Sequence, residues 1–343
     1  MKTIAEILTR ERLEQILRQF GRLRIGVIGD IALDAYWQVD MTRAHLSRET
    51  PLFPRPVVGE AYSPGAGGNA AQDLVALGVG EVSVFSVFGE DTWGSRLRSE
   101  LAQRGIRPEA ILTQAERRTV AYIKPILHGY NSQQEDSRLD FENTAPLSAE
   151  TEAQLVAALE ARLGQLDAVL VADQFELYGV ITPVVRQRLG ELAERFPALF
   201  VVDSRQRIGS FTHMALKPNW LEAAAVLKPQ GDPRQIGWEE LAQGGQRLAQ
   251  QNGRPVFITL SEKGVLVCTP EAHEEIAAAH VRPPLDPVGA GDAFMAALAA
   301  ALSAGASPWE AGALANLAAG VTVEKLNQTG SAAPEEILAR YAL

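Results

Sequence analysis

Short stretches of continuous apolar, strand-like sequence alternate with helix-like segments along most of this 343-residue chain. The strand-like stretches cover residues 24–28, 82–88, 168–172, 199–202, 256–260 and 265–268, and the helix-like segments include 92–104, 182–195, 293–304 and 308–325. Strands that are apolar throughout, rather than at every second position, are typical of a parallel sheet covered by helices on both faces. The alternation therefore predicts an α/β fold, a three-layer α/β/α arrangement around a mainly parallel sheet.

Two segments, 36–62 and 119–141, break this rhythm because each carries strand-like sequence without a helix of its own. Together they predict a small β-sheet that projects from the main domain and forms a lid over a site. Two unrelated surface excursions are the alternative. Thr3 and Glu6 have the spacing of a capping box, and the apolar periodicity around them predicts a helix over about 3–20. We expect residues 1–343 to form a single domain.

Composition and charge exclude several classes of function. The net charge of −10 and the lack of any Lys/Arg-rich run argue against a nucleic-acid partner. The single cysteine, Cys268, excludes an internal disulfide and a cysteine-rich metal site. The first 20 residues lack the apolar core of a signal peptide, and the longest apolar run, 293–302, is too short to cross a membrane. We therefore expect a cytoplasmic protein without a membrane partner.

The heptapeptide 286–292, Asp-Pro-Val-Gly-Ala-Gly-Asp, runs directly into an Ala-rich helical segment. A Gly-Ala-Gly turn at the start of a helix directs backbone N–H groups toward one point, at the positive end of the helix dipole, and so suits an anion. Asp292 at the end of that turn is a poor anion ligand but a good proton acceptor. Together they favour phosphoryl transfer to a hydroxyl. The alternative is an ordinary Gly-rich turn in which Asp292 caps the helix.

Two further polar segments follow the first strand. In open α/β sheets, ligands bind outside the carboxyl ends of the strands. Asp30 and Asp34 come directly after the strand and can accept hydrogen bonds from sugar hydroxyls, or else serve as turn and cap residues. The Gly-rich segment 65–68 then leads to Asn69 at a helix start. Its small residues let a ligand approach the backbone closely, and Asn69 offers both a donor and an acceptor.

Asn219 and Glu222 stand three apart at a helix start, hence on one face. Such a pair can hold a hydrated Mg²⁺ that meets nucleotide phosphates, and the alternative is a capping box between the same two residues. The turn 259–264 offers hydroxyls and Lys263 to a nucleotide. The sequence lacks a Gly-x-x-x-x-Gly-Lys-Ser/Thr loop, which excludes a P-loop enzyme.

The order of these segments resembles that of the ribokinase-like (PfkB) carbohydrate kinases over roughly residues 24–338, nearly the whole chain. Within that family, the chain is most similar to the heptose-phosphate kinase domain of bifunctional ADP-heptose synthases. Besides Gly-Ala-Gly-Asp at 289–292, the matching segments are Gly29-Asp30 with Leu33-Asp34 and Tyr36-Trp37, Ser47-Arg48 with Pro51 and Pro54, Gln133-Gln134 with 138–142, Pro218-Asn219 with Glu222, Ser261-Glu262 with Gly264, and Asn316 with Gly320.

The resemblance implies a ribokinase-like domain with a β-lid, a sugar substrate, ATP and Mg²⁺ as cofactors, and a homodimer formed through the lid. It makes Asp292 the general base and Gly289, Ala290 and Gly291 the anion hole. The residues expected to bind the substrate are Asp30, Asp34, Arg48, Gly65, Gly67, Gly68, Asn69, Arg138 and Asp173. Those expected at the nucleotide are Asn219, Thr259, Ser261, Lys263, Gly264 and Asn316, with Asn219 and Glu222 meeting Mg²⁺ through water. A monovalent cation near Asp286 is a further expectation.

The chain departs from the family pattern at positions that bear on the substrate. Pro287-Val288 stands where the family carries a threonine hydroxyl near the nucleotide. Glu176 and Tyr122 stand where the heptose kinases carry lysines, which argues against a heptose 7-phosphate unless Arg205 or Arg207 compensates. We therefore expect an ATP-dependent sugar kinase. The alternatives are a heptose-7-phosphate 1-kinase, a kinase of a nucleoside or vitamin-like alcohol, and a kinase-like binding protein without turnover.

Overall fold

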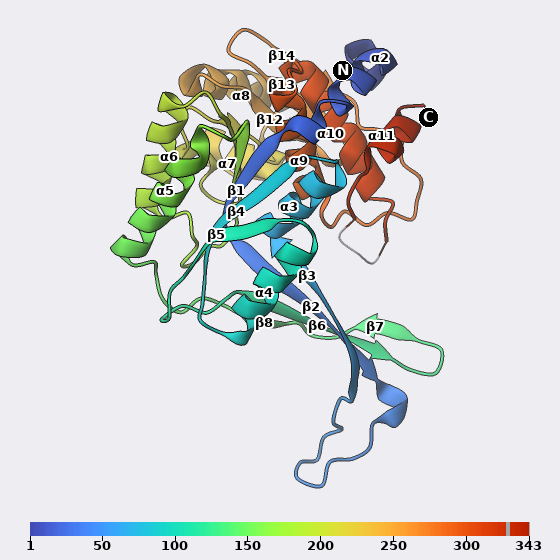
Figure 1. Ribbon diagram of the computed structural model, residues 1–343. Coiled ribbons are helices and arrows are strands. Elements are labelled where there is room, and N and C mark those ends of the chain that lie inside the picture. Colours follow the sequence, from blue (N-terminus) through green and yellow to red (C-terminus); the bar gives the residue numbers. More distant parts are fainter. Residues whose placement is uncertain (327–329, 343) are drawn as a thin grey trace.

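A nine-stranded sheet forms the centre of the computed structural model, which describes residues 1–326 and 330–342 (Figure 1). Its strands are β1 (Arg24–Gly29), β4 (Glu81–Phe88), β5 (Arg107–Thr113), β9 (Ala168–Asp173), β10 (Leu199–Ser204), β11 (Ala215–Leu216), β12 (Val256–Thr259), β13 (Val265–Cys268) and β14 (His273–Ile276). They lie in the order β14-β13-β12-β11-β10-β9-β1-β4-β5. The pairs from β12 to β5 are parallel, and β13 and β14 add antiparallel pairs at one edge.

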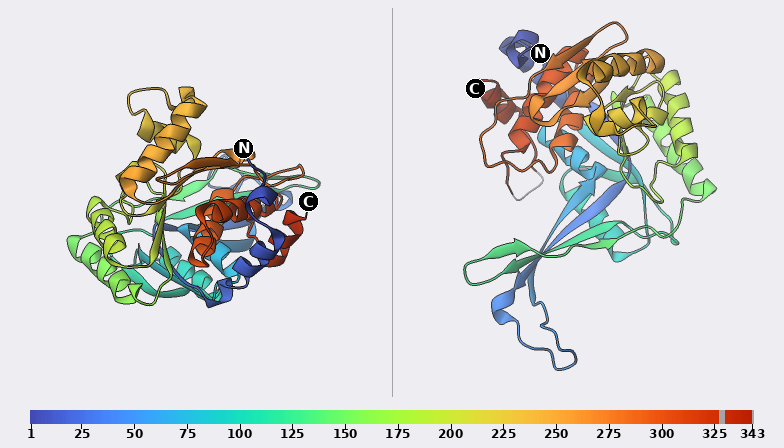
Figure 2. Two further views of the ribbon diagram at one scale, coloured as in Figure 1. Left: turned by 90° about the horizontal axis from the view of Figure 1, so that it is seen from above. Right: turned by 180° about the vertical axis from the view of Figure 1, so that it is seen from behind.

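Helices cover both faces of this sheet, as the view from above in Figure 2 shows. They are α1 (Ile4–Ile7), α2 (Arg10–Leu17), α3 (Gly67–Ala76), α4 (Thr92–Gln103), α5 (Ala149–Leu163), α6 (Pro183–Arg195), α7 (Trp220–Leu227), α8 (Trp238–Asn252), α9 (Ala290–Ser303), α10 (Pro308–Thr322) and α11 (Pro334–Tyr341). The 3₁₀ helices are η1 (Phe20–Arg22), η2 (Met41–Arg43), η3 (Ile208–Ser210), η4 (Pro233–Gln235) and η5 (Ser261–Lys263). Among the described residues, none of the helices combines the length and apolar character needed to cross a membrane.

Side chains of the parallel strands alternate between two separate cores. In β9, Leu170 packs into the core that includes α3, α9 and α10, whereas Val171 packs into the core that includes α5, α6 and α8. Burial on both faces explains why these strands are apolar at successive positions. The predicted three-layer α/β/α fold with a mainly parallel sheet is confirmed.

A second, five-stranded sheet projects from the α/β body (Figures 1 and 2), and we call it the lid. It consists of β2 (Ile31–Asp40), β3 (Val57–Ala66), β6 (Ala121–His128), β7 (Gln133–Glu135) and β8 (Leu139–Phe141). The strands lie in the order β3-β2-β6-β7, and β8 also pairs with β6. Helix α4 packs at its base, where the rings of Trp93 and Phe141 meet edge to face at 5.7 Å. The small separate sheet predicted from 36–62 and 119–141 is confirmed.

The boundaries of the first elements differ from the predicted ones. The helix predicted over 3–20 is two helices, because Thr9 leaves helical geometry and caps α2 by accepting the N–H of Arg12. The lid begins earlier than predicted: after Gly29, whose φ is 131°, β2 starts at Ile31. Asp34 therefore lies within a lid strand rather than in a turn. Edge strands β5 and β14 carry charged side chains and lack the continuous apolar sequence on which the prediction depends.

The junction between β3 and α3 contains a strained residue. Ala66 has φ 53° and ψ −132°, a region that residues other than glycine rarely occupy. We expect Ala66→Gly to stabilise the protein by about 1 kcal/mol, because relief of about 1–3 kcal/mol of strain exceeds glycine's ~0.5–1 kcal/mol entropic cost. Urea denaturation measures the change. The control Ala153→Gly, at an exposed position inside α5, should destabilise by about 1 kcal/mol. An equal loss in Ala66→Gly would contradict the strain.

Candidate active site

Polar side chains from distant segments gather where the parallel strands end. Asp203 lies in β10, Gln174 follows β9 and Lys217 follows β11. Asn69 is in the first turn of α3, and Asp292 is in the first turn of α9. Because parallel strands end at one edge of a sheet, residues that follow them meet in space although they are far apart in the sequence.

Two side-chain amides hold the carboxylate of Asp292. Nδ2 of Asn69 donates to one oxygen at 3.1 Å, and Nε2 of Gln174 makes a longer contact of 3.5 Å to the other. Burial, followed by the negative charge of Asp203, raises the pKa of Asp292 to about 6. The two amides and Lys217 oppose that rise. Asp292 is therefore mainly ionised at neutral pH and has the proton affinity of a useful general base.

The start of α9 forms the predicted Gly-rich turn. Gly289 is the N-cap residue, with a left-handed φ of 83°. The N–H of Ala290 donates to the carbonyl of Pro287 at 3.2 Å, and the N–H of Asp292 donates to the carbonyl of Gly289 at 3.1 Å. Ala290 is thus engaged within the turn. Of the three residues of the predicted anion hole, Gly289 and Gly291 are left to offer their N–H groups to an anion.

A buried ion pair adjoins this turn. Lys217 is 4% exposed, and its ammonium lies 3.1 Å from the carboxylate of Asp203. Glu222 is a further carboxylate of the cluster, and burial, followed by Asp203, raises its pKa. The prediction from sequence misses Asp203, Lys217 and Gln174 as site residues. In the sequence, these residues are marked only by their position at the end of an apolar strand. The strand before Lys217, β11, has two residues and is too short to be recognised.

Asn219 and Glu222 form a capping box at the start of α7. Oδ1 of Asn219 accepts the N–H of Glu222 at 2.9 Å, and Oε2 of Glu222 accepts the N–H of Asn219 at 2.7 Å. The capping alternative therefore describes the local structure of this pair. Among the described residues, no group of three or more His, Cys, Asp and Glu side chains could hold a metal ion directly. The carboxylates of Asp203 and Glu222 instead suit a Mg²⁺ that keeps most of its waters.

Asp34 extends the site onto the lid. It is 6% exposed, and its carboxylate lies 2.9 Å from the ammonium of Lys124 in β6. The prediction from sequence also misses Lys124, which lies beside Asp34 only because β2 and β6 pair in parallel. A Cβ on Gly65 would lie 2.6 Å from Oδ2 of Asp34. Gly65 is therefore glycine because Asp34 lies against it.

Gly67 and Gly68 are buried, and they serve packing within the protein. A Cβ on Gly67 would lie 2.7 Å from the Cβ of Ala172, and one on Gly68 would lie 2.6 Å from the Cβ of Pro64. These two glycines allow close approach of the protein's own segments, and a contact of their backbone with the substrate stays a prediction. Asn69, the next residue, keeps its place in the site.

Asp30 and Asp173, expected to bind substrate, are fully buried and contact the protein itself. The carboxylate of Asp30 accepts three backbone N–H groups at 2.6 to 2.8 Å, those of Gln174, Phe175 and Val180. Asp173 pairs with Arg207 at 2.5 Å and accepts the hydroxyl of Ser204 at 2.6 Å. Both carboxylates order the loop after β9, so the structure supports a positioning role for them, and their direct contact with the substrate stays a prediction. Arg207 also donates to the carbonyl of Phe175 at 2.8 Å, so its guanidinium is engaged with the loop after β9.

The predicted nucleotide residues Thr259, Ser261 and Lys263 lie beside the start of α7. Thr259 ends β12 and forms a bridge with Asn219. Ser261 and Lys263 are exposed in η5, where Ser261 has a left-handed φ of 55°. Their hydroxyls and ammonium are open to a ligand at this edge of the sheet.

Gly264 and Asn316, by contrast, contact the backbone at the end of β14. Gly264 has φ 106°, and a Cβ there would lie 2.1 Å from the carbonyl oxygen of Ile276. Asn316 is buried, and its Nδ2 donates to the carbonyls of Ile276 at 3.3 Å and Ala277 at 3.0 Å. These contacts are structural, and the expectation that both residues meet the nucleotide stays a prediction.

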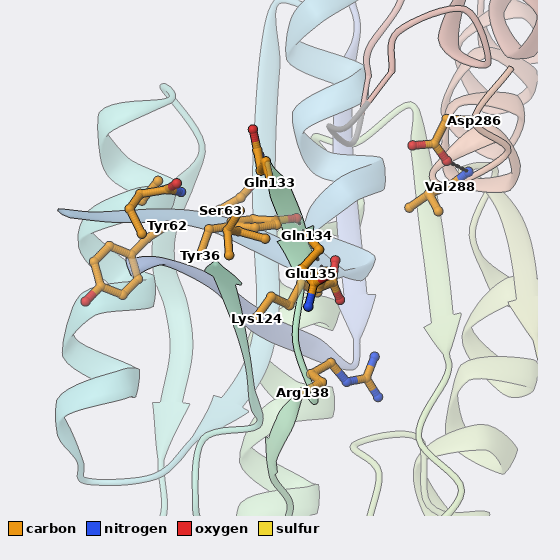
Figure 3. A pocket seen from close by; sticks show the side chains of 13 residues that line it. Tyr36, Tyr62, Ser63, Lys124, Gln133, Gln134, Glu135, Arg138, Asp286 and Val288 are labelled. Atoms are coloured by element: carbon orange, nitrogen blue, oxygen red, sulfur yellow. Dashed lines mark hydrogen bonds between the residues drawn. The ribbon is translucent and has the colours of Figure 1, made fainter. Parts of the chain in front are cut away.

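An open cleft of about 1040 Å³ lies between the lid and the heptapeptide 286–292. Figure 3 shows Asp286 and Val288 on one side and lid residues on the other. The lining residues are Tyr36, Gln38, Ala61, Tyr62, Ser63, Lys124, Ile126, Gln133, Gln134, Glu135, Arg138, Asp286 and Val288. Hydroxyl, amide and charged groups dominate this lining, so the cleft suits a ligand with many polar groups.

Of three further expected residues, Arg138 and Asp286 line this cleft and Arg48 does not. Arg138 lines it while pairing with Asp140 at 2.6 Å. Arg48 belongs to the loop between β2 and β3, at the far end of the lid from the α/β body (Figure 1). Asp286 accepts the N–H of Val288 at 3.0 Å. The structure therefore keeps Arg138 and Asp286 beside the cleft and separates Arg48 from Asp292 within one chain.

The sequence matches the family model described as pfkB family carbohydrate kinase over residues 59–336. It is 33% identical over 337 residues to the bifunctional protein HldE of Trichlorobacter lovleyi, covering 97% of this chain and 66% of that protein. The protein of the same name from Methylococcus capsulatus is 33% identical over 330 residues, covering 94% and 64%. The chain thus spans about two thirds of the length of these relatives.

The structure is similar to solved kinase structures at low sequence identity. Ribokinase from Thermotoga maritima has a TM-score of 0.65 and 21% identity, with 94% of this chain and 100% of that chain covered. Phosphofructokinase-2 from Escherichia coli, solved in complex with potassium, has a TM-score of 0.72 and 17% identity, with 93% and 98% covered. At these identities the likeness establishes the fold.

Proposed function

This chain belongs to the pfkB family of carbohydrate kinases, and from that premise we propose that it transfers the γ-phosphoryl group of ATP to a sugar hydroxyl with Asp292 as general base. The observation that carries the proposal is the position of Asp292. It stands in the first turn of α9, its carboxylate contacts the amides of Asn69 and Gln174, and the buried Lys217 adjoins it. This arrangement supports turnover over the alternative of a binding protein without catalysis.

In the proposed reaction, the acceptor hydroxyl gives its proton to Asp292 while its oxygen attacks the γ-phosphorus of ATP. The bond from that phosphorus to the bridging oxygen breaks, and ADP leaves with the electron pair. Asn69 keeps the carboxylate of Asp292 turned toward the hydroxyl. The N–H groups of Gly289 and Gly291 and the α9 dipole stabilise the charge on the transferred group. Most of the catalysis is positioning and charge stabilisation.

Asp203 and Glu222 are the residues that we expect to hold Mg²⁺, through its waters. The ion, when bound, neutralises charge on the nucleotide phosphates. Asp203, Glu222 and Asp292 are carboxylates that share the single buried ammonium of Lys217, so this cluster carries an excess of negative charge. That excess supports a divalent cation here. A monovalent cation at Asp286 is a separate proposal, supported by the position of this carboxylate at the start of the heptapeptide.

On the acceptor side, Asp34 and Asn69 offer the groups that a sugar needs. Oδ1 of Asn69 is buried and has no hydrogen-bond partner among the described residues. An unpartnered buried acceptor costs about 1–3 kcal/mol, and a sugar hydroxyl donating to it would remove that cost. A screen of sugars, sugar phosphates, nucleosides and vitamin-like alcohols for ADP release tests the substrate class. Release with the nucleosides or vitamins alone would refute a sugar substrate.

A heptose 7-phosphate is the second candidate substrate, and one observation favours it. Arg138 stacks on the ring of Tyr122 at 4.5 Å, and the positive charge of Arg205 also acts on Tyr122. Arg205 is exposed and makes no ion pair among the described residues. These two guanidinium groups could hold a phosphate at the far end of a sugar. In the same screen, a preference for sugar phosphates over neutral sugars would select this candidate.

The decrease of kcat/KM on the acid side of its pH profile should report the titration of Asp292. Its pKa of about 6 means that the proton acceptor is lost as the pH falls below about 6, so kcat/KM should drop about tenfold per pH unit there. Initial rates at several pH values under subsaturating sugar measure it. The residual activity of Asp292→Asn should lack this decrease. A decrease at the ordinary carboxyl pKa of ~4 would contradict the assignment.

We further propose a homodimer formed through the lid. The tip loop and outer strand of the lid expose apolar side chains, namely Leu46, Leu52, Phe53, Val57 and Val58. Large apolar side chains exposed close together in the sequence favour association. Sedimentation velocity measures the oligomeric state, and a lid-borne dimer would bring the tip loop with Arg48 toward the partner.

A further inference from the structure

We propose that Lys217 binds the γ-phosphate of the nucleotide, and that its buried ion pair with Asp203 opens when Mg²⁺ and the nucleotide bind. This inference rests on the proposed phosphoryl transfer and assigns a role to a residue outside the predicted motifs. It makes Lys217 a catalytic residue that touches the reacting group, and Asp203 the carboxylate that exchanges the ammonium for the hydrated metal ion.

The position of the ammonium is the first support. A Cβ built on Gly291 would lie 3.8 Å from Nζ of Lys217, so the ammonium lies against the first turn of α9. The backbone of Lys217 is fixed by its N–H bond to the carbonyl of Val202 at 2.9 Å. The side chain therefore reaches the turn whose N–H groups are proposed to face the phosphate. An anion bound at Gly291 would lie within contact of Lys217.

The electrostatics of this position are the second support. The start of a helix carries partial positive charge, which disfavours a cation and favours an anion. Lys217 nevertheless places an ammonium there and is almost fully buried. A buried ion pair seldom adds net stability, because desolvation of both groups offsets their attraction. An anion bound at the head of α9 would meet both the partial positive charge of the helix and the ammonium of Lys217, in addition to the carboxylates already beside that ammonium.

The negative partners of Lys217 give the third support. Its ammonium pairs with Asp203 and also feels the charges of Glu222 and Asp292, and these attractions raise the pKa of Lys217 against the effect of burial. Because the same carboxylates are proposed to meet hydrated Mg²⁺, arrival of the ion would weaken their hold on the ammonium. Lys217 could then turn to the phosphate without leaving Asp203 unpaired.

The test is calorimetric and uses no sugar. The wild type is titrated with Mg²⁺ and either ADP or the non-hydrolysable β,γ-imido analogue of ATP, and the ratio of the two affinities reports contacts to the γ-phosphate. We expect Lys217→Met to reduce the preference for the analogue by about tenfold or more, the worth of one charge-assisted hydrogen bond. Lys228→Met, at the other end of α7, is the matched control and should keep the wild-type ratio.

Asp203→Asn tests the exchange of partners. It releases Lys217 from its pair, so binding of the analogue without Mg²⁺ should strengthen several-fold. The further gain on adding Mg²⁺ should shrink. Should Lys217→Met fail to fold because Asp203 is left buried and unpaired, the double variant Lys217→Met/Asp203→Asn removes both charges and should show the same reduced preference.

The outcomes separate the inference from the function on which it rests. A wild-type preference for the analogue that persists in Lys217→Met or in the double variant overturns the role of Lys217 and leaves the kinase proposal standing. A wild type that binds neither nucleotide overturns the kinase proposal itself. A purely structural ion pair would lower the melting temperature of Lys217→Met while leaving the affinity ratio at the wild-type value.

Discussion

Asp292→Asn should lower kcat by at least ~100-fold, the low end of the effect of removing a general base, while the affinity for ADP changes little. The amide keeps the shape of the side chain and its contact with Asn69, but it cannot accept the hydroxyl proton. Because the N–H groups of Gly289 and Gly291 and the α9 dipole remain, the variant should keep its nucleotide site. Turnover at saturating sugar and ATP, together with calorimetry for ADP, measures both parts.

The matched control for this substitution is Asp232→Asn, the same chemical change at an exposed residue that caps η4. It should leave kcat at the wild-type level. If Asp292→Asn turned over sugar at a rate close to that of the wild type, the proposed mechanism would be excluded. If both kcat and ADP affinity collapsed together, the substitution would have disrupted the start of α9, and the base would need testing by Asp292→Ala.

Much of the fold could be predicted from the sequence, because burial of a strand or helix requires a pattern of apolar residues that can be read along the chain. Strands buried on both faces must be apolar at successive positions, so β9 and β10 could be found. Edge strands and lid strands escape that constraint, since one face or one edge meets solvent. The early start of β2 at Ile31 was hidden for a different reason. Its first residues are apolar like those of β1, and only Asp30 stands between the end of β1 at Gly29 and the start of β2.

The site was predictable where chemistry needs a local motif, and less so where it needs a tertiary contact. Asp292 was found because Gly-Ala-Gly before a helix is a recognisable anion turn. The contacts of Asp30 could not be predicted, because its place after β1 does not tell whether the carboxylate faces the cleft or the N–H groups of the next loop, which it accepts here. Lys124 and Lys217 enter the site only through strand pairing and packing, which a single sequence does not reveal.

The four aspartates predicted for this edge of the sheet fall into two groups, according to the groups that their carboxylates contact. Asp30 and Asp173 meet backbone N–H groups or an arginine and are satisfied within the protein. Asp34 meets the ammonium of Lys124, which lines the cleft, and Asp292 meets the side-chain amides of Asn69 and Gln174. A carboxylate whose partners face outward can exchange them for a ligand, whereas one surrounded by its own loop cannot. This difference directs attention to Asp34 as the acceptor-binding carboxylate.

Asp34→Asn should lower kcat/KM for the sugar by at least ~100-fold, because two charge-assisted hydrogen bonds to hydroxyls are each worth about 1.5–3 kcal/mol. The substitution also leaves the ammonium of Lys124 without the carboxylate that lies 2.9 Å away. The residues proposed for the nucleotide belong to segments other than β2, so ADP affinity should be unchanged. Initial rates over a range of sugar concentrations and calorimetry with ADP measure the two effects.

Asp40→Asn, at the other end of the same strand β2 where Asp40 caps η2, is the control and should retain wild-type kcat/KM. If the Asp34–Lys124 pair only stabilises the structure of the lid, we expect a different pattern of activity and melting temperature. In that case Lys124→Met would match Asp34→Asn in both activity and melting temperature. If Asp34 binds the sugar, Asp34→Asn should be the more severe in kcat/KM when the two variants unfold at similar temperatures. Equal activity losses at equal stability would therefore count against Asp34 as a sugar ligand.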